Sequence, residues 1–391
     1  MAEPHEKRSE HQPMGQVRVG GSGQWVFCGL FLLMIFTVPV IQVLHERHQD
    51  EPIQELEVFS EPPSREGFEK YERALERNSV VAEAVRRQVQ WAMLHGLNEG
   101  NEKCIAGYGG MLYYRPSVDA VLAPSFMDGP AQEGDPLPAI IAFRDSLAAR
   151  GVRLILLIVP GKESVEPEGL APSYPDEWGP PRNPGMTDFL NSLRAEGVEL
   201  VDACEVLWAA RGEDPVYLRQ DTHWTPEGMG LVADVVAEQV GEGLAGDHHY
   251  DPQPVRVESH GDLYDMLDLP PYKSRLTEQT VTTQRVIDPA TGNPLEPDTS
   301  SPIVLLGDSF TNVYSAGPMG WGDHGGLGEQ LALRMRRPVD VIAKNDGGVN
   351  TARIALARRG DPLAEKAAVI WQFAERDLVV SRGDWEIIDI K

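Results

Sequence analysis

One stretch of the sequence, residues 25–44, restricts what the chain can fold into more than any other. It reads WVFCGLFLLMIFTVPVIQVL and holds no charged side chain, and it has about the length that a helix needs to cross a bilayer. Pro39 would kink a helix in water but is tolerated in a membrane span. A cleaved signal peptide is the alternative, but its apolar core would normally be shorter, and the sequence IQVLHERH offers no small-residue cleavage site. We therefore expect an uncleaved transmembrane anchor.

The charges on the two sides of this segment predict its orientation. Lys7, Arg8 and Arg18 precede it, whereas Arg47 alone follows it closely. Because basic residues stay on the cytoplasmic side, we expect the N-terminus in the cytoplasm and the rest of the chain outside. The expected organisation is a cytoplasmic tail at 1–24, an anchor at 25–44, a stalk with an amphipathic helix at 45–100, and a main domain at 101–391.

The amphipathic helix is predicted from about Arg65 to Asn98. Apolar residues recur there at steps of three and four, which is the period of one helix face. These are Phe68, Tyr71, Leu75, Val80, Val81, Val85, Val89 and Met93. Such a stripe packs on its own domain or against a partner, and packing on its own domain is the more common case.

Apolar runs that alternate with helical stretches predict the fold of the main domain. The run RLILLIVPGK at 153–162 ends in Pro and Gly, as a buried parallel strand does. A helix precedes it, from about Pro138 to Arg150. Further strands are expected within VELVDACEVL (198–207), SPIVLLGDSF (301–310), PVDVIAKNDGG (338–348) and AAVIWQFAERD (367–377). This alternation indicates an α/β fold with a doubly wound, mostly parallel sheet, whose ligands bind at the carboxyl ends of the strands. Residues 270–300, rich in Thr, Pro and Asp, are expected to form a surface excursion.

The charge of the chain excludes some partners. Acidic residues outnumber basic ones by 60 to 35, which gives a formal net charge of −25. Such a surface repels nucleic acid, and it repels other polyanions unless a basic groove interrupts it. Cys104 and Cys204 would face an oxidising compartment, where they form either a disulfide or two buried free thiols.

A serine stands in a tight turn directly after one of the expected strands. In LLGDSF, Gly307 allows the turn, Ser309 is at its tip, and Phe310 leads into a helix. Such a turn exposes a nucleophile and aims backbone N–H groups at the reacting carbonyl. The simpler interpretation is that Asp308 or Ser309 only caps the helix.

The stretch DTHWTP supplies the partners that a nucleophilic serine needs. Residues two apart in an extended segment project to the same side, so Asp221 can bind one ring nitrogen of His223 while the other nitrogen faces the serine. Thr225 and Pro226 suit the cap and first position of a helix. Alternatively, Asp221 holds the turn and His223 packs under Trp224. A metal site is disfavoured, since no third ligand has a fitting spacing.

These motifs resemble those of the SGNH hydrolase superfamily, and specifically the alginate O-acetyltransferase AlgJ/AlgX family, in which the histidine motif precedes the serine motif. DTHWTPEG and GDSF are the specific matches. The weaker matches are GYGGMLYY at 107–114, VPGKESVEPEGL, GDLYDMLDLP and WQFAERDL. In the first of these, Met111 replaces the family's usual Trp. The resemblance covers about residues 100–380.

The resemblance implies an acyltransferase with a Ser-His-Asp triad that needs no cofactor of its own. Ser309 would carry the acetyl group, His223 would act as general base and Asp221 would orient it. Further candidates for the oxyanion hole and the sugar groove are Gly307, Asn345, Asn350, Tyr314 and Arg376. Lys162, in the Pro-x-Lys segment, is a weaker candidate of the same kind.

The resemblance also implies where the enzyme works and with what. A polysaccharide would accept the acetyl groups, a membrane-embedded acyltransferase would supply them, and the catalytic domain would lie in the periplasm at the inner membrane. An esterase or deacetylase with the same triad, or a non-catalytic polysaccharide-binding protein, are the competing functions. The net charge of −25 fits a neutral or cationic polymer, or an anionic one such as alginate held in a local basic groove.

Overall fold

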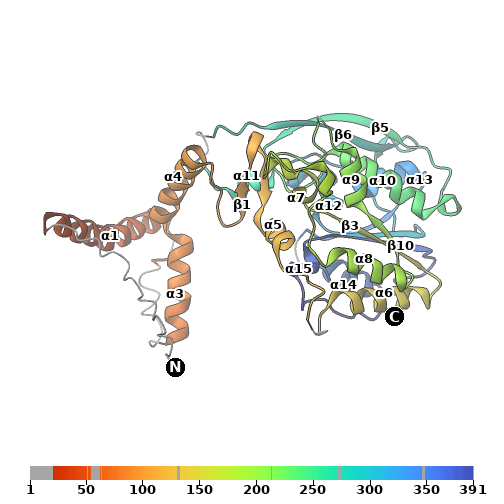
Figure 1. Ribbon diagram of the computed structural model, residues 1–391, viewed down its shortest axis with the longest axis horizontal. Coiled ribbons are helices and arrows are strands. Elements are labelled where there is room, and N and C mark those ends of the chain that lie inside the picture. Colours follow the sequence, from red (N-terminus) through yellow and green to blue (C-terminus); the bar gives the residue numbers. More distant parts are fainter. Residues whose placement is uncertain are drawn as a thin grey trace, which may run out of the picture. The chain divides into compact units, whose positions relative to one another are not determined.

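The computed structural model describes residues 21–50, 52–53, 62, 64–129, 133–212, 214–270, 274–345 and 348–390. The chain forms two compact units, Met1–Val89 and Gln90–Lys391. The expected strands and the site that follows them all lie in the second unit (Figure 1).

The first unit contains the apolar segment. Helix α1 (Gly21–His48) includes it, with Pro39 inside the helix. Its part Gln24–His48 contains an 18-residue window with a mean hydropathy of 2.4, and it is long and apolar enough to cross a membrane. Helix α3 (Arg65–Asn78) follows, and helix α4 (Val80–Leu97) begins in this unit and ends in the next. The helix expected over 65–98 is thus confirmed with one break, where the Ser79 hydroxyl accepts from the N–H of Ala82 and starts α4.

A parallel sheet forms the centre of the second unit, as predicted. Its five strands lie in the order β4-β3-β10-β8-β9, and every neighbouring pair is parallel. In chain order the strands are β3 (Arg153–Val159), β4 (Glu199–Asp202), β8 (Ile303–Gly307), β9 (Asp340–Ala343) and β10 (Ala368–Ala374).

Two layers of helices bury the two faces of this sheet (Figure 1). One layer contains α6 (Pro136–Ala148), α8 (Met186–Ala195) and α14 (Thr351–Ala357). The other contains α9 (Ala203–Ala210), α10 (Pro226–Val240) and α13 (Leu327–Met335). Alternate residues of β3 enter the two cores, Leu154 and Leu156 on one side and Ile155 and Leu157 on the other. This is why the strand is a continuous apolar run.

The stretch 198–207 corrects a sequence-based expectation. Only its first part is a strand, because the Asp202 carboxylate accepts from the N–H of Cys204 at 3.1 Å and begins α9. Cys104 and Cys204 are both free and buried, which settles the choice between a disulfide and two thiols. Burial raises the pKa of the Cys104 thiol to about 12.

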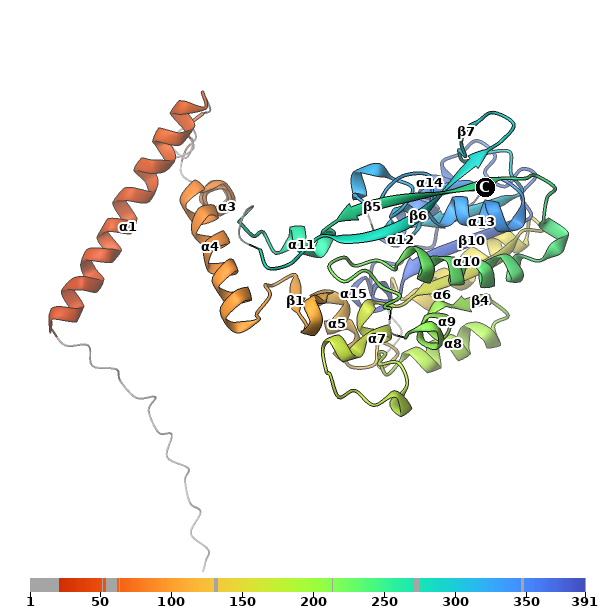
Figure 2. The same cartoon turned by 90° about the horizontal axis from the view of Figure 1, so that it is seen from above.

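A second, antiparallel sheet contains β5 (Asp251–Ser259), β6 (Gln279–Asp288) and β7 (Asn293–Pro294). Figure 2 shows β5 and β6 as a long ribbon beside α10 and α13. The expectation of a mere surface excursion at 270–300 was therefore wrong for β6, whose Val281, Thr283 and Val286 are buried.

Short elements complete the unit. Strands β1 (Cys104–Ala106) and β2 (Leu112–Tyr114) pair antiparallel. The short helices are α5 (Arg115–Leu122), α7 (Lys162–Val165), α11 (Asp262–Met266), α12 (Ser309–Asn312) and α15 (Asp377–Val380). The 3-10 turns are η1 (Tyr108–Gly110), η2 (Pro167–Gly169), η3 (Asp176–Trp178), η4 (Glu242–Leu244) and η5 (Gly317–Met319).

Candidate active site

The serine turn lies at the carboxyl edge of the sheet. Strand β8 ends at Gly307, and Ser309 is the first residue of α12. A Cβ at Gly307 would lie 2.0 Å from the Thr311 hydroxyl oxygen, so only glycine lets the chain turn this tightly. Ser309 is half-buried, which leaves its hydroxyl within reach of a substrate.

Asp308 and Gln372 hold this turn in place. The Asp308 carboxylate accepts from the N–H of Phe310 at 2.8 Å, so Asp308 rather than Ser309 caps the helix. Gln372, on β10, donates to that carboxylate at 2.9 Å, and its carbonyl accepts from the Asp308 N–H at 3.0 Å. The only signal for Gln372 in the sequence was a polar residue inside an apolar strand.

The histidine lies on the loop that enters α10. The N–H of Leu218 donates to the carbonyl of His223 at 3.0 Å, and the N–H of Thr225 donates to the carbonyl of Val216 at 2.8 Å. The Thr225 hydroxyl caps α10 by accepting from the N–H of Gly228, as the Thr-Pro pair predicted. The ring of Phe310 packs edge-on against the His223 ring, with centroids 4.8 Å apart.

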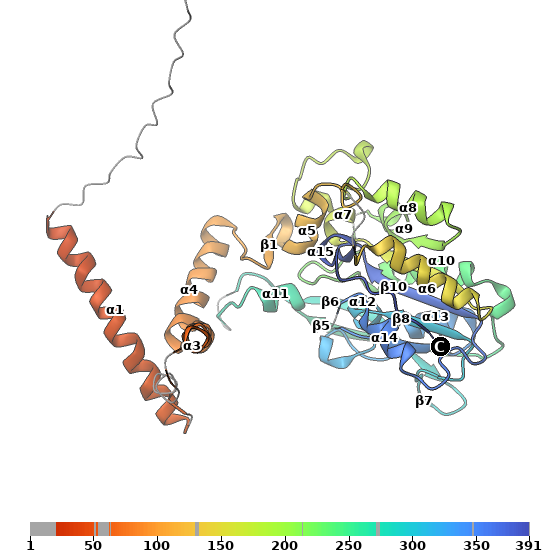
Figure 3. The same ribbon diagram turned by 90° about the horizontal axis from the view of Figure 1, so that it is seen from below.

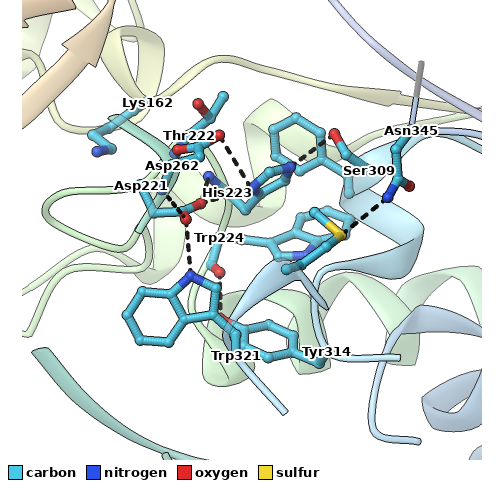
Figure 4. A network of polar contacts seen from close by, with 12 residues as sticks. Lys162, Asp221, Thr222, His223, Trp224, Asp262, Ser309, Tyr314, Trp321 and Asn345 are labelled. Atoms are coloured by element: carbon cyan, nitrogen blue, oxygen red, sulfur yellow. Dashed lines mark hydrogen bonds and ion pairs between the residues drawn. The ribbon is translucent and has the colours of Figure 1, made fainter. Parts of the chain in front are cut away.

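The structure brings Ser309, His223 and Asp221 into one hydrogen-bonded chain (Figure 4). His223 Nδ1 lies 2.6 Å from Asp221 Oδ1, and His223 Nε2 lies 2.8 Å from Ser309 Oγ. A carboxylate only accepts, so the ring proton is on Nδ1 and Nε2 is free to take the serine proton.

Asp221 is held by four donors, two on each oxygen. Oδ1 accepts from Nδ1 and from the backbone N–H of His223. Oδ2 accepts from the Trp321 indole N–H at 2.8 Å and from the Asp262 N–H at 2.9 Å. Gly261 permits the contact between the Asp262 N–H and Asp221, because a Cβ at Gly261 would lie 2.6 Å from the Cβ of Asp221. No motif in the sequence pointed to Trp321.

Burial and charge set the protonation of this pair. Burial alone raises the pKa of Asp221, but the charge of His223 and the hydrogen bonds outweigh it and lower the pKa to about 2. Burial alone lowers the pKa of His223, but the charge and hydrogen bond of Asp221 outweigh it and raise the pKa above its ordinary value. A raised pKa makes His223 a stronger base.

The structure adds an acidic residue that the motifs did not connect to the histidine. Asp262 Oδ2 lies 3.9 Å from His223 Nδ1, and burial followed by repulsion from Asp221 raises the pKa of Asp262 to about 6. The expectation that no third ligand has a fitting spacing missed Asp262, which is distant in sequence but forms a compact cluster with Asp221 and His223. His223 Nδ1 and Asp221 Oδ1 lie at a hydrogen-bond distance of 2.6 Å, and Asp221 Oδ2 accepts from the Trp321 indole N–H, so the atoms that this pair would offer to an ion are already engaged.

Asn345 is the candidate donor that the structure places near Ser309 (Figure 4). Its amide oxygen accepts from the Asn312 side chain at 2.7 Å. Among the residues that the structure describes, its amide nitrogen meets the Met319 sulfur at 3.4 Å, a weak acceptor that a developing oxyanion could displace.

Other candidates from the sequence serve the fold. Asn350 donates to the Asp384 carbonyl and accepts from Arg353, so both ends of its amide bind the C-terminal segment and its neighbour rather than an oxyanion. Tyr314 is fully buried, and its hydroxyl donates to the Trp224 carbonyl at 2.7 Å, so it lines no groove.

The two candidate cations are also enclosed. Arg376 is 18% exposed and lies over the Tyr114 ring at 5.3 Å, so it packs rather than lining an open groove. Buried Lys162 donates to the carbonyls of Leu112 and Arg219 at 2.7 and 3.1 Å, and burial lowers its pKa to about 8. It ties β2 to the loop that carries Asp221.

A doubly wound parallel sheet with a serine turn at its carboxyl edge is the architecture of the SGNH hydrolase-like proteins. Residues 125–375 match the family model described as SGNH hydrolase-like domain, acetyltransferase AlgX, and the chain belongs to this family. Both the predicted fold class and the resemblance are thereby confirmed.

Several relatives carry names that describe a reaction. A probable alginate O-acetylase AlgJ of Pseudomonas syringae pv. tomato is 30% identical over 308 residues, which cover 74% of this chain and 73% of the relative. One from Pseudomonas putida is 32% identical over 259 residues, 62% of this chain and 63% of that one. The solved O-acetyltransferase domain of Pseudomonas putida AlgJ superposes with a TM-score of 0.53 at 25% identity, over 70% of this chain and 91% of that one. The chain is thus an enzyme of the acyltransferase class.

Proposed function

We propose that this chain transfers acetyl groups to hydroxyls of an exopolysaccharide, through an acetyl ester on Ser309. The observation that carries the proposal is the unbroken chain of hydrogen bonds from Asp221 through His223 to the Ser309 hydroxyl. A serine hydroxyl is a weak nucleophile until a base removes its proton, and His223 Nε2 is the base within reach.

The reaction would proceed in two half-reactions. First, Ser309 Oγ attacks the carbonyl of an acetyl donor while His223 takes its proton, and the donor's leaving oxygen departs with that proton. Second, a sugar hydroxyl gives its proton to His223 and attacks the acetyl ester, and Ser309 Oγ leaves and regains the proton. Asp221 remains ionised throughout and keeps the His223 ring in the tautomer that can accept.

The oxyanion of each half-reaction would be stabilised by two donors. One is the backbone N–H of Ser309 at the start of α12, and the other is the Asn345 side chain, whose amide nitrogen donates to a thioether. Removing one such donor typically costs about 10²–10³ in rate.

The setting of the reaction follows from the anchor and the relatives. Their names support alginate or a related polymer as acceptor. Helix α1 would hold the enzyme in the inner membrane with residues 1–24 in the cytoplasm, 45–100 as the link, and 101–391 as the catalytic domain in the periplasm. A membrane-embedded acyltransferase would deliver the acetyl groups, so the chain itself would bind no cofactor.

The test uses the full chain in detergent with an activated acetyl ester, followed by intact mass. We expect an acetyl adduct that is absent from Ser309→Ala and is discharged faster by an oligosaccharide that becomes acetylated. An adduct that water discharges at the same rate with or without the oligosaccharide would make the chain an esterase. No adduct would contradict the proposal.

A further inference from the structure

We propose that the groove beside the turn at 107–111 is a binding subsite for an acidic sugar residue of the acceptor chain, which rests on the proposed function. The groove has a volume of about 670 Å³. Its walls are the last turn of α4, the turn between β1 and β2, and the segment around Arg275. Figure 3 shows β1 beside α11, the helix that starts at Asp262. The part of the groove wall formed by residues 94–112 lies outside the segment 125–375 that matches the family model.

The groove is joined to the loop that carries Asp221 and His223. The N–H of Leu112, a lining residue, donates to the Arg219 carbonyl at 2.8 Å. Lys162 bridges the carbonyls of the same two residues. On the inner side, Leu94 and Leu112 pack in one apolar cluster with Leu263, the residue after Asp262. A polymer held in the groove therefore rests against the same rigid wall that positions the triad.

An exposed aromatic ring gives the groove a platform for a sugar. Tyr108 is 61% exposed although it lies in a short, well-defined turn. Gly109 and Gly110 follow it with φ of 64° and 77°, a conformation that keeps the turn tight and leaves no side chain over the ring. The apolar C–H face of a pyranose ring can pack on such a side chain while its hydroxyls stay in water.

Charge distinguishes an acidic sugar from a neutral one. Arg275 is the only charged residue that lines the groove in the described part of the chain. One of its terminal nitrogens donates to the Leu94 carbonyl at 3.0 Å and to the Asn98 side chain at 2.9 Å, which fixes the guanidinium. Among the described residues no carboxylate lies within ion-pair distance of it. A fixed, unpaired guanidinium is suited to bind a carboxylate.

Another large cavity among the described residues has the opposite character. It measures about 830 Å³, and its charged lining residues are Glu133, Asp135, Asp384 and Glu386. A polyanion would be repelled there. The net charge of −25 is therefore unevenly distributed, and the groove at Tyr108 and Arg275 is the better route for a uronate polymer.

The test compares Tyr108→Ala and Arg275→Met with Trp178→Ala in the full chain in detergent. Trp178 is a matched control, because it is an aromatic residue that is 71% exposed and lies outside the groove. For each variant we would divide kcat/KM for acetylation of a de-acetylated oligomannuronate by the rate of acetyl-Ser309 formation from the activated ester. We expect this ratio to fall about fivefold in each groove variant and to stay unchanged in the control. The loss should grow with the length of the oligomannuronate and be small for a disaccharide.

Binding measured apart from turnover separates this proposal from the proposed function. We would titrate oligomannuronate and a neutral oligosaccharide of equal length into Ser309→Ala by calorimetry, with and without each groove substitution. Weaker oligomannuronate binding in both groove variants supports the subsite even if the wild type acetylates nothing. Arg275→Lys, which keeps the charge, should bind more tightly than Arg275→Met. Unchanged binding and an unchanged ratio would overturn the proposal, as would equal affinity for the neutral sugar. If the groove substitutions lowered acetylation only when membranes, rather than the activated ester, supply the acetyl groups, the groove would instead bind a protein partner.

Discussion

Replacing Asp221 by asparagine would test the geometry of the site directly, because the shape of the side chain is kept and its acceptors are not. Two donors point at each carboxylate oxygen, His223 Nδ1 and N–H at one, Trp321 Nε1 and the Asp262 N–H at the other. Asparagine offers one carbonyl oxygen and one amide nitrogen. In either orientation, the amide nitrogen of the asparagine faces two buried donors.

The two orientations have different costs. With its oxygen toward His223, the introduced asparagine leaves the Trp321 and Asp262 donors unsatisfied, at a cost of about 1–3 kcal/mol each. The free energy of unfolding therefore falls by about 2–6 kcal/mol. With its nitrogen toward His223, the ring changes tautomer, Nε2 carries the proton, and acylation falls by about 10⁴. Removing the carboxylate charge also lowers the pKa of His223, because that charge raises it.

A second substitution tells the two orientations apart. In the wild type, Trp321→Phe removes a hydrogen bond to a charged group and destabilises by about 1.5–3 kcal/mol. On the Asp221→Asn background it removes a repulsive donor if the oxygen faces His223, so the double variant is more stable than the two single effects predict. Thermal unfolding would be followed by near-UV circular dichroism of the full chain in detergent, and acylation by intact mass. An Asp221→Asn protein with wild-type stability, an acylation rate within about tenfold of the wild type and no coupling to Trp321 would refute this account of the site.

Four further predictions concern the same site. Because the pKa of His223 is raised and its neutral form is the base, the acylation rate should increase with pH through a midpoint above 6.5, and a lower midpoint would count against the assignment. The pKa of Asp221 falls from 3.8 to about 2 on folding, so its ionisation contributes roughly 2 kcal/mol to the free energy of unfolding. This contribution should be present above about pH 4 and lost as the pH approaches 2. Acid unfolding of the wild type and of Asp221→Asn would measure it. Gln372→Leu removes both bonds to Asp308, so it should slow acylation about tenfold, whereas Gly307→Ala, whose Cβ meets Thr311 at 2.0 Å, should destabilise by about 1–3 kcal/mol in thermal unfolding.

Features that depend on local pattern could be predicted from the sequence. Strand β3 could be recognised because both of its faces are buried and every side chain after Arg153 is apolar. Spacing also indicated that Asp221 and His223 share one side of an extended segment, and the structure places them 2.6 Å apart. The cap of α10 at Thr225 was equally local, since Thr-Pro is a frequent helix start.

Features that depend on distant contacts were missed. Trp321 meets Asp221 across 100 residues, and Gln372 meets Asp308 across 64. No pattern in the sequence links either pair. The same limit explains Asn350, a candidate side-chain donor for the oxyanion hole, because tertiary contacts that the sequence does not reveal commit its amide to Asp384 and Arg353.

The exposure of Ser309 bears on why such an enzyme would transfer rather than hydrolyse. His223 and Asp221 are 3% and 1% exposed, but Ser309 is half-buried at the edge of the sheet, so the protein alone does not shield an acetyl ester from water. The acceptor polymer must then provide part of the shielding when it lies over the serine. In that case, a substitution at Tyr108 or Arg275 that weakens binding of the polymer would raise the KM for the polymer. It would also raise the share of acetyl groups that are lost to water. Hydrolysis of the acetyl ester would thus report on acceptor binding at a place that does not touch the ester.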